Sequence, residues 1–221
     1  MAIQQVFYKL TGIPVTGTIN DDLIYVDLPA ALTGGALNGN DGTDTLRITA
    51  TVAGSYVIGS SITNVEIVEI SATLDEISSS TTRGSTSAIN VDASAQSTSL
   101  TIYGNDGSNE IRGGTAADTL YGYGGNDVIY GNGGADVLYG GDGDDLFVLT
   151  STANLSFGLS DDQIYGEAGT DKLVVAMAAD TSFSFTDSTI LWVEEVVLGT
   201  VSAGKMTADY AGSHLTASAL T

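Results

Sequence analysis

The sequence predicts an all-β fold, a parallel β-solenoid in which the chain winds in coils that stack on one another. The main observation is a repeat of nine residues that runs without interruption from Gly104 to Val148. A second observation is the remaining chain, which is rich in Thr, Ser and Val, contains only 2 Pro and no Cys, and shows few helix signals. Self-similarity at a fixed short period is the sequence signature of a repeat architecture. We therefore expect one continuous solenoid with short flanking β segments.

The repeat consists of five units, GNDGSNEIR, GGTAADTLY, GYGGNDVIY, GNGGADVLY and GGDGDDLFV. Position 1 is always glycine, and position 6 is always an acid or its amide, at Asn109, Asp118, Asp127, Asp136 and Asp145. Position 8 is always apolar, at Ile111, Leu120, Ile129, Leu138 and Phe147. The first six residues turn the chain, because glycine adopts positive φ without steric cost and Asn or Asp tolerates it. The next three form a short strand whose middle side chain points into the core.

Two units complete one coil, so like positions on one side of the solenoid recur in every second unit. This spacing stacks Asn109, Asp127 and Asp145 on one edge, and Asp118 and Asp136 on the other. Stacked carboxylates repel one another unless a cation lies between them, and calcium fits because it accepts about six to eight hard oxygen ligands. Asp-Gly turns without metal are the alternative, but random turns would not keep one register through five units.

Two units depart from the pattern, since Asn109 replaces the expected Asp and Ala116 replaces the usual Gly. We expect weaker binding at these two places. Besides position 6, the candidate calcium ligands of the repeat are the loop acids Asp106 and Asp142 and the backbone carbonyls that the glycine turns leave exposed. The glycines concerned are Gly104, Gly107, Gly122, Gly125, Gly131, Gly134, Gly140 and Gly143.

The five units resemble the nonapeptides of the repeats-in-toxin (RTX) family of calcium-dependent bacterial exoproteins, which includes adhesins, proteases, lipases and surface-layer proteins. The clear repeats cover positions 104–148 of the chain, and the likeness is greatest to surface-layer and other extracellular structural members. The resemblance implies a calcium-loaded β-roll as the fold, calcium as the cofactor, and leaderless type I secretion. The roll is a shared module and does not by itself define what the protein does.

Looser units precede the regular ones. Residues 17–25 place Asp22 at the metal position and Ile24 at the core position, and residues 39–47 place Asp44 at the metal position. Either unit alone could be an ordinary Asp-Gly turn. Between residues 48 and 103 we expect further coils without glycine loops, with strands at 65–70, 88–92 and 99–103 and a short helix at 74–80.

The carboxyl third echoes the amino-terminal part, and it adds Asp162 and Asp171 as candidate calcium ligands. The matching segments are 162–165 with 22–25, 169–175 with 42–48, and 192–197 with 64–69. These echoes indicate an internal duplication within a single solenoid domain spanning residues 1–221. Its parts are amino-terminal coils with worn repeats at 1–100, the regular roll at 101–148, and carboxyl-terminal coils that repeat the amino-terminal cassette at 149–221.

The chain is strongly acidic, with 27 acids against 6 bases and a net charge of −21. Such a balance excludes nucleic acid as the expected partner, because phosphate contacts need Lys and Arg. It suits a chain that stays soluble and unfolded until cations neutralise it. Without cysteine, bound metal would take over the stabilising task of disulfides. The amino terminus has no Sec-type signal and no segment is long enough to span a membrane, so we expect leaderless export to the cell surface or beyond.

Residues typical of catalysis are scarce, and we expect no enzyme. The single histidine, His214, has no G-x-S-x-G motif around it, and no H-E-x-x-H zinc motif occurs. Adjacent acids could form a glycosidase pair, but three of the four pairs lie inside calcium-type loops. These pairs are 21–22, 144–145, 161–162 and 194–195.

Tyrosine recurs at the last position of a unit, which should alternate outward from the core residue and form an aromatic row on a strand face. The residues are Tyr25, Tyr103, Tyr121, Tyr130, Tyr139 and Tyr165. Such a row stiffens the roll by cross-strand stacking, or it forms a contact face for a neighbouring subunit or a surface polysaccharide.

Three functions remain open. The first is a secreted, calcium-triggered structural protein that assembles with itself into a surface layer or filament, because neither terminus carries a charged cap and unblocked parallel edges pair end to end. The second is an adhesin-like module that binds a glycan or surface ligand through the tyrosine face. The third is the secretion and folding tail of an RTX exoenzyme. Calcium ions, further copies of the chain and a polysaccharide are the expected partners.

Overall fold

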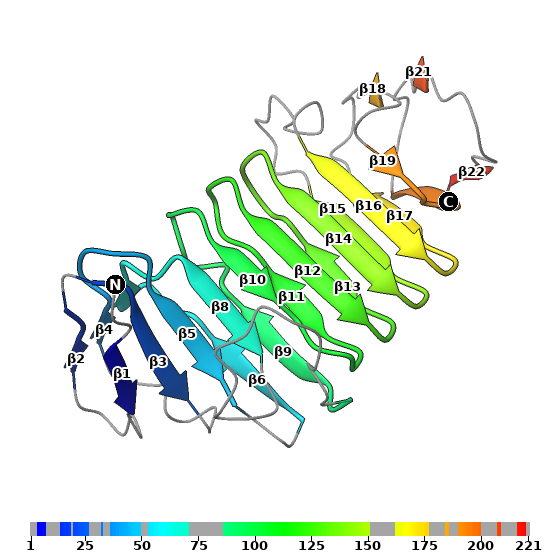
Figure 1. The fold of residues 1–221 in the computed structure, drawn as a ribbon. Coiled ribbons are helices and arrows are strands. Elements are labelled where there is room, and N and C mark those ends of the chain that lie inside the picture. The colour runs from blue at the N-terminus through cyan, green and yellow to red at the C-terminus, as the bar shows by residue number, and fades with distance from the viewer. Residues whose placement is uncertain are drawn as a thin grey trace.

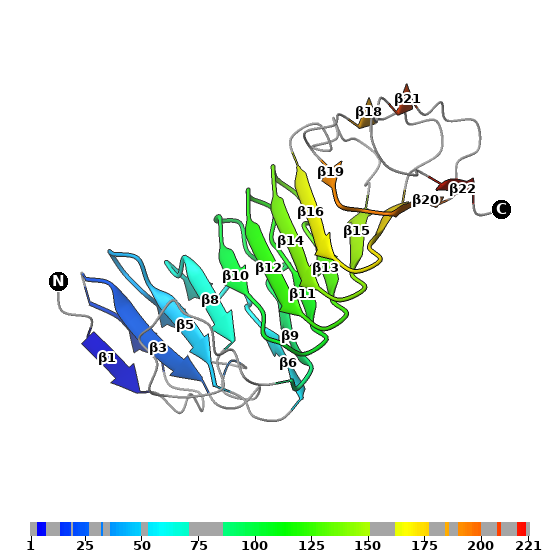
Figure 2. The same cartoon turned by 45° about the vertical axis from the view of Figure 1, so that its right-hand side comes forward.

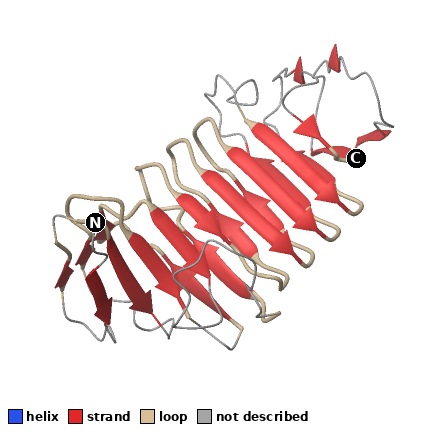
Figure 3. Cartoon of the chain, viewed as in Figure 1, coloured by secondary structure: helices blue, strands red, loops and turns tan. Residues whose placement is uncertain are grey.

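A computed structural model of the protein describes residues 4–7, 14–18, 20–26, 32, 36–49, 53–70, 86–150, 162–176, 184–185, 190–199, 207–208 and 216–219. Within these residues the regular structure consists of β-strands, with a single 3₁₀ position at Leu32. The strands wind into an elongated solenoid with the N- and C-terminal ends far apart (Figures 1 and 3). The strand pairs are parallel throughout the described residues. The predicted all-β parallel solenoid is therefore confirmed.

Two long sheets form opposite sides of the solenoid. Sheet 1 contains, in spatial order, β1 (Gln4–Phe7), β3 (Asp22–Val26), β5 (Thr45–Ile48), β8 (Ile67–Ile70), β10 (Thr101–Tyr103), β12 (Thr119–Gly124), β14 (Val137–Asp142), β16 (Gln163–Ala168) and β19 (Ile190–Leu191). Sheet 2 contains, in spatial order, β22 (Thr216–Ala219), β20 (Glu195–Gly199), β17 (Lys172–Ala176), β15 (Leu146–Thr150), β13 (Val128–Tyr130), β11 (Glu110–Arg112), β9 (Ile89–Asp92) and β6 (Gly54–Val57). Figure 2 shows the two sheets lying back to back along the central coils.

A third sheet lies in the amino-terminal coils and was not predicted. It contains β2 (Val15–Thr16), β4 (Leu37–Asn38) and β7 (Ile62–Thr63). Up to β9 the described strands belong to three sheets, and from β9 to β17 the chain alternates between two. The coils with three sheets are longer, since Leu23 pairs with Thr45 whereas Thr101 in the regular roll pairs with Thr119. The extra residues leave room for a third short side. A fourth, small sheet pairs β18 (Ser184–Phe185) with β21 (Thr207–Ala208).

The register of the central coils follows the nonapeptide repeat. Thr101 pairs with Thr119, and Thr119 with Val137, so each coil contains two units. The next coil is longer, because Val137 pairs with Gln163. Strands β12, β14 and β16 each contain 6 residues. They exceed the predicted three because the pairing in sheet 1 continues beyond the tyrosine, for example from Gly141 to Glu167.

The core is a stack of apolar side chains between the two long sheets. All five predicted position-8 residues are fully buried, with 0% of their surface exposed, namely Ile111, Leu120, Ile129, Leu138 and Phe147. The stack continues into the flanking coils through Ile102, Ile164 and Leu173. Burying one such side chain stabilises a fold by about 1.5–3 kcal/mol. A coil therefore gains its stability by covering its neighbour.

The strands predicted between residues 48 and 103 are confirmed, since β8, β9 and β10 lie inside the expected ranges. The short helix expected at 74–80, and His214, lie outside the described residues. No helix able to cross a bilayer occurs in the described part of the chain.

Candidate metal centre

The loops that lead into the strands line two edges of the solenoid. Edge 1 holds the loops before the strands of sheet 1, and edge 2 holds those before sheet 2. The glycine loops among them start at a position-1 glycine and end at a position-6 acid or amide where both residues are described, whereas the loop before β10 ends at Leu100. The position-6 side chains are all buried, with Asp22, Asp44, Asp118, Asp136 and Asp162 on edge 1 and Asn109, Asp127, Asp145 and Asp171 on edge 2. The stacking expected from the two-unit coil is therefore present, and it continues into the flanking coils.

The position-6 residues are joined by hydrogen bonds along each edge. The backbone N–H of Asn109 donates to Oδ1 of Asp127 at 2.7 Å, and that of Asp127 donates to Oδ1 of Asp145 at 2.8 Å. On edge 1, Asp118 donates in the same way to Asp136, and Asp136 to Asp162, both at 2.8 Å. An amino-terminal series on edge 1 joins Asp22 to Asp44 in the same way, also at 2.8 Å. We call these three series the carboxylate ladders. One oxygen of each stacked acid is thus satisfied by the coil before it.

The amino-terminal ladder on edge 1 and the ladder on edge 2 each end in a glutamate that sequence analysis missed. The backbone N–H of Asp44 donates to Oε2 of Glu66 at 2.8 Å, and that of Asp171 donates to Oε2 of Glu194 at 2.6 Å. In return, the N–H groups of Glu66 and its successor donate to the carbonyl of Asp44, and those of Glu194 and its successor to the carbonyl of Asp171. The sequence signal for these glutamates is the Val-Glu pair that the matching segments 64–69 and 192–197 share. It was not recognised because a glutamate at such a position also fits an ordinary strand.

The residues before these glutamates match as well. Asn64 and Trp192 each adopt a left-handed backbone, with φ of 51° and 55°. The two cassettes therefore share one hydrogen-bond pattern, although the first lies on edge 1 and the second on edge 2. The third matching segment, 162–165, leads into sheet 1 and therefore lies on the opposite edge from Asp171. It takes no part in the correspondence between the two cassettes.

The second carboxylate oxygen is the unusual feature of the site. In the described part of the chain, Oδ2 is buried without a hydrogen-bond partner in Asp44, Asp127, Asp136, Asp145 and Asp171. Burial is the largest cause that raises the pKa of Asp127 and Asp136 to about 8, of Asp145 to about 7 and of Asp171 to about 6. An ionised oxygen buried without a donor is unfavourable. These five positions therefore need either a proton or a cation.

A backbone carbonyl faces each of these oxygens where both loops are described. A side chain added to Gly122 would meet both Oδ2 of Asp127 and the carbonyl oxygen of Gly140, the latter at 2.6 Å. A side chain on Gly140 would likewise meet Oδ2 of Asp145 and the carbonyl oxygen of Gly166 at 2.8 Å. Two acceptors converge on one space that only a glycine leaves open. Carboxylate and carbonyl oxygens are the ligands that calcium prefers, so the residues fit this ion.

Carbonyls are necessary for such a site. Within the described residues no three acidic, histidine or cysteine side chains gather closely enough to hold a metal by themselves. A calcium ion at these loops would therefore take most of its ligands from the backbone. This mixed ligand set agrees with the glycine-rich composition of the loops.

The remaining candidate residues have other places. Asp106 and Asp142, at position 3, are exposed and lie outside the carboxylate ladders. The position-4 glycines pack against the backbone of the preceding loop, as Gly143 does against the carbonyl of Gly125. This close approach, found also at Gly107, Gly125 and Gly134, sets the spacing of successive loops.

Parallel coils, glycine loops and buried acceptors define the class of metal-binding β-rolls. Residues 103–138, 124–149 and 158–181 match the family model of the RTX calcium-binding nonapeptide repeat. These parts of the chain therefore carry RTX calcium-binding nonapeptide repeats, as the resemblance indicated, and calcium is the ion that such repeats bind. No curated protein and no solved structure matched the chain.

The outer face of sheet 1 carries the aromatic row. Tyr103, Tyr121, Tyr139 and Tyr165 stack in order, with ring centroids 5.0, 4.6 and 4.8 Å apart. The predicted row of six is shorter for two reasons. Tyr130 lies on sheet 2, where its ring packs against the guanidinium of Arg112. Tyr25 occupies the same register position as the row, but Arg47 and Glu69, which form a 2.8 Å ion pair, separate it from Tyr103.

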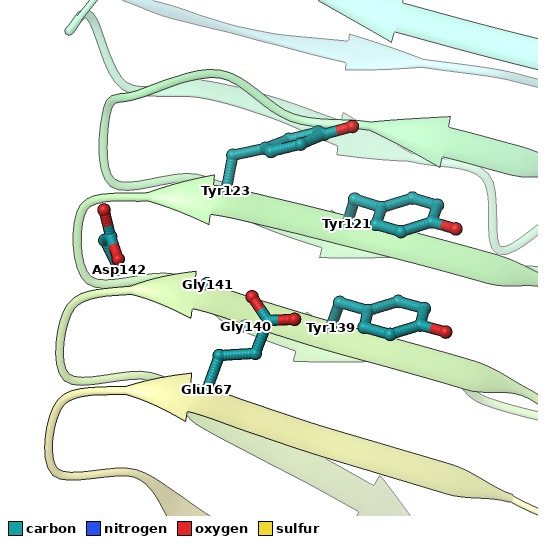
Figure 4. A pocket seen from close by; sticks show the side chains of 7 residues that line it. All are labelled: Tyr121, Tyr123, Tyr139, Gly140, Gly141, Asp142 and Glu167. Atoms are coloured by element: carbon teal, nitrogen blue, oxygen red, sulfur yellow. The ribbon is translucent and has the colours of Figure 1, made fainter. Parts of the chain in front are cut away.

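A notch lies beside this row. Tyr123, Gly141 and Glu167 are register partners on neighbouring strands, so the missing side chain of Gly141 leaves a gap between a ring and a carboxylate. Figure 4 shows Tyr123 and Glu167 on either side of Gly141. The gap has a volume of about 490 Å³ and is lined by Tyr121, Tyr123, Tyr139, Gly140, Gly141, Asp142 and Glu167.

Proposed function

We propose that this protein is a secreted structural protein that folds when it binds calcium and then assembles with itself into a surface layer or filament. The observation that carries the proposal is the set of five buried Oδ2 atoms without donors on the carboxylate ladders, within the described residues. RTX repeats typically occur in secreted proteins, and this supports a site of action where calcium is abundant.

The chain's own charges provide the switch. The net charge is −21, so the acidic side chains repel one another and keep the unfolded chain expanded. Folding without metal brings Asp127 and Asp145 into one buried ladder, which is unfavourable while both are ionised. Bound calcium supplies the positive charge that these oxygens lack. Millimolar extracellular calcium suffices even for sites as weak as about 10⁻⁴–10⁻³ M.

The proposed ligands are the oxygens that converge in the described loops. They are the side chains of Asp44, Asp127, Asp136, Asp145 and Asp171 and the carbonyls of Asn64, Gly140, Gly166 and Trp192. Position-1 glycines hold the space open between them, because a larger residue there would meet both oxygens.

Self-assembly is supported by the two ends of sheet 1. In the described residues, β1 and β19 each pair with another strand on one side only. All strands of this sheet run parallel, so β19 of one molecule can continue into β1 of another, which is a head-to-tail contact. Such a contact does not close on itself and produces a filament or an open lattice.

The adjacent acids support a structural role in place of catalysis. Oδ1 of Asp144 accepts the N–H of Thr170 at 2.9 Å, and Oδ1 of Asp21 accepts the N–H of Thr43 at 2.9 Å. The outer acid of each of these two pairs thus ties its loop to the next coil, while the inner acid belongs to a ladder. We accordingly propose that the protein is not an enzyme.

The experiment that tests this proposal combines size-exclusion chromatography with negative-stain electron microscopy at increasing calcium. We expect monomers in chelator and ordered polymers at millimolar calcium, reversed by adding chelator. A folded protein that stays monomeric at every calcium concentration would contradict self-assembly.

The notch between Tyr123 and Glu167 favours a second candidate, an adhesin-like module that binds a surface glycan. An aromatic ring and two exposed carboxylates, Asp142 and Glu167, offer a stacking surface and acceptors for sugar hydroxyls. A glycan array probed with the calcium-loaded protein and with Tyr123→Ala tests it. Binding that the substitution abolishes supports this function, and no binding to any glycan contradicts it.

A further inference from the structure

The glycine loops differ in the direction of the peptide group that joins positions 1 and 2. This direction depends on the place of the loop in the order of loops along its edge. We call a series of stacked glycine loops without interruption a run. One run on edge 1 starts at Gly17 and continues at Gly39, and a second starts at Gly113 and continues at Gly131. The run on edge 2 starts at Gly104 and continues at Gly122, Gly140 and Gly166.

Every later loop of a run has a left-handed residue at position 2. The residues and their φ angles are Asn40 at 83°, Tyr123 at 81°, Asn132 at 69°, Gly141 at 114° and Glu167 at 75°. In each of these loops the carbonyl of position 1 approaches the position-1 glycine of the preceding loop, as the carbonyl of Gly131 approaches Gly113. Their position-6 acids are the same five whose Oδ2 has no partner in the described residues.

The first loop of every run has the opposite arrangement. Its position-2 residue, Thr18, Asn105 or Gly114, is not left-handed. Its N–H donates to the loop's own position-6 side chain, from Gly114 to Oδ2 of Asp118 at 2.6 Å and from Asn105 to Oδ1 of Asn109 at 3.0 Å. Thr18 donates to Oδ2 of Asp22 in the same way.

Asn109 goes further, because its side-chain amide nitrogen donates two hydrogen bonds of its own. Its Nδ2 donates to the carbonyl of Ile89 at 2.9 Å and to Oδ1 of Asn105 at 2.9 Å. Asn105 is held in turn by the N–H of Gly107, which donates to its Oδ1, and by the carbonyl of Ser87, which accepts from its Nδ2. At the start of edge 2, donors therefore stand where later loops present only acceptors.

A physical reason connects the two arrangements. A later loop turns its position-1 carbonyl back toward the loop before it, and this turn points the following N–H away from its own acid. The first loop at Gly113 faces Gln96 of the preceding coil and not a glycine loop, so its peptide is free to satisfy its own carboxylate. An oxygen that already accepts an N–H gains less from a cation than one without a donor.

We propose that the position-6 side chain of the first loop in each run takes no calcium, and that calcium binding starts with the acid of the second loop. The inference rests on the calcium-binding function proposed above. It gives each edge a metal-independent starting loop, formed by Asp22, Asn109 or Asp118, on which calcium-bound loops are then added. Calcium loading thereby has a direction along the solenoid.

Matched variants on edge 1 test this proposal. Bound calcium is counted by native mass spectrometry of the full chain at saturating calcium, with circular dichroism as the check of folding. We expect Asp44→Asn and Asp136→Asn each to bind one ion fewer than the wild type. We expect Asp22→Asn and Asp118→Asn to bind the wild-type number.

Equal losses in all four variants would overturn the inference while leaving calcium binding itself intact. A wild-type chain without bound calcium would instead overturn the proposed function. If one first-loop variant fails to fold, the pair on the other run decides, since Asp22 with Asp44 and Asp118 with Asp136 are independent comparisons.

Discussion

The backbone N–H of Asp145 donates a 2.9 Å hydrogen bond to Oδ1 of Asp171, although 26 residues separate the two. The same bond joins Asp127 to Asp145 across 18 residues. The ladder therefore keeps its geometry when the coil becomes longer, because the loop and not the length of the coil places the acid. What varies among the acids is the environment of the second oxygen.

Replacing a ladder acid should raise the calcium requirement for folding. Asp127→Ala and Asp136→Ala each remove a proposed ligand and the acceptor of a backbone N–H. We expect the calcium concentration at the folding midpoint to rise about tenfold in each variant, which corresponds to about 1.4 kcal/mol. Circular dichroism during a calcium titration measures it. Asp142→Ala is the control, since this acid is exposed outside the ladders, and an unchanged midpoint in both ladder variants would count against the site.

The calcium-free fold should lose stability as the pH rises. The pKa of Asp127 and Asp136 is raised to about 8 in the folded chain, whereas an unfolded Asp has a pKa of about 3.9. Between these values the folded state binds protons that the unfolded state has released, so stability is fully present below about pH 4 and is lost toward pH 8. Far-ultraviolet circular dichroism in chelator at pH 5 and pH 8.5 compares the folded fraction at the two pH values, and a larger folded fraction at pH 8.5 would refute the assigned burial.

Position-1 glycine should be irreplaceable in a calcium loop. In Gly122→Ala the new Cβ would meet Oδ2 of Asp127 and lie 2.6 Å from the carbonyl oxygen of Gly140. Overpacking of this kind costs about 1–3 kcal/mol, and we expect calcium-saturated stability to fall by that amount. Gly59→Ala is the matched control, because its Cβ would meet nothing within 4 Å. Equal stability of the two variants in urea unfolding would show that the space above Gly122 is not needed.

The tyrosine row should stabilise the roll independently of any ligand. Tyr139 stacks on Tyr121 with an interplanar angle of 2° and on Tyr165 with one of 10°. Each such pair contributes about 0.5–1.5 kcal/mol beyond area burial, so Tyr139→Ala should cost about 1–3 kcal/mol from stacking alone. Urea unfolding at saturating calcium, with exposed Val57→Ala as the reference, measures the loss. If Tyr139→Ala loses no more unfolding free energy than Val57→Ala, the tyrosine row does not stabilise the roll and can act only as a contact surface.

The central coils could be predicted well because the repeat specifies both the turn and the buried face of the strand. A glycine loop sets the turn and the apolar position 8 sets the strand face, so the register of Thr101 with Thr119 could be predicted. The amino-terminal coils were harder, because their longer steps contain no fixed pattern for the strand pairs of the third sheet, such as Val15 with Leu37.

The hydrogen-bond donors to the second carboxylate oxygen of the ladder acids could not be predicted from the sequence. Whether Oδ2 accepts an N–H depends on the φ angle of position 2, and Asn occurs in both states, left-handed at Asn132 and not at Asn105. The deciding factor is whether the position-1 carbonyl turns toward the glycine of the preceding coil, which is a tertiary relation. Likewise Tyr123 joins the aromatic face, with its ring 5.7 Å from that of Tyr121, because β12 is longer than three residues.

The most direct test of the account is a calcium titration of the purified protein followed by far-ultraviolet circular dichroism at neutral pH. The five Oδ2 atoms that are buried without a donor in the described residues predict a largely unfolded chain in chelator and a cooperative gain of β-structure as calcium rises to millimolar levels. Chelator should reverse the gain. A chain that shows the same β-structure with and without calcium would contradict the central claim.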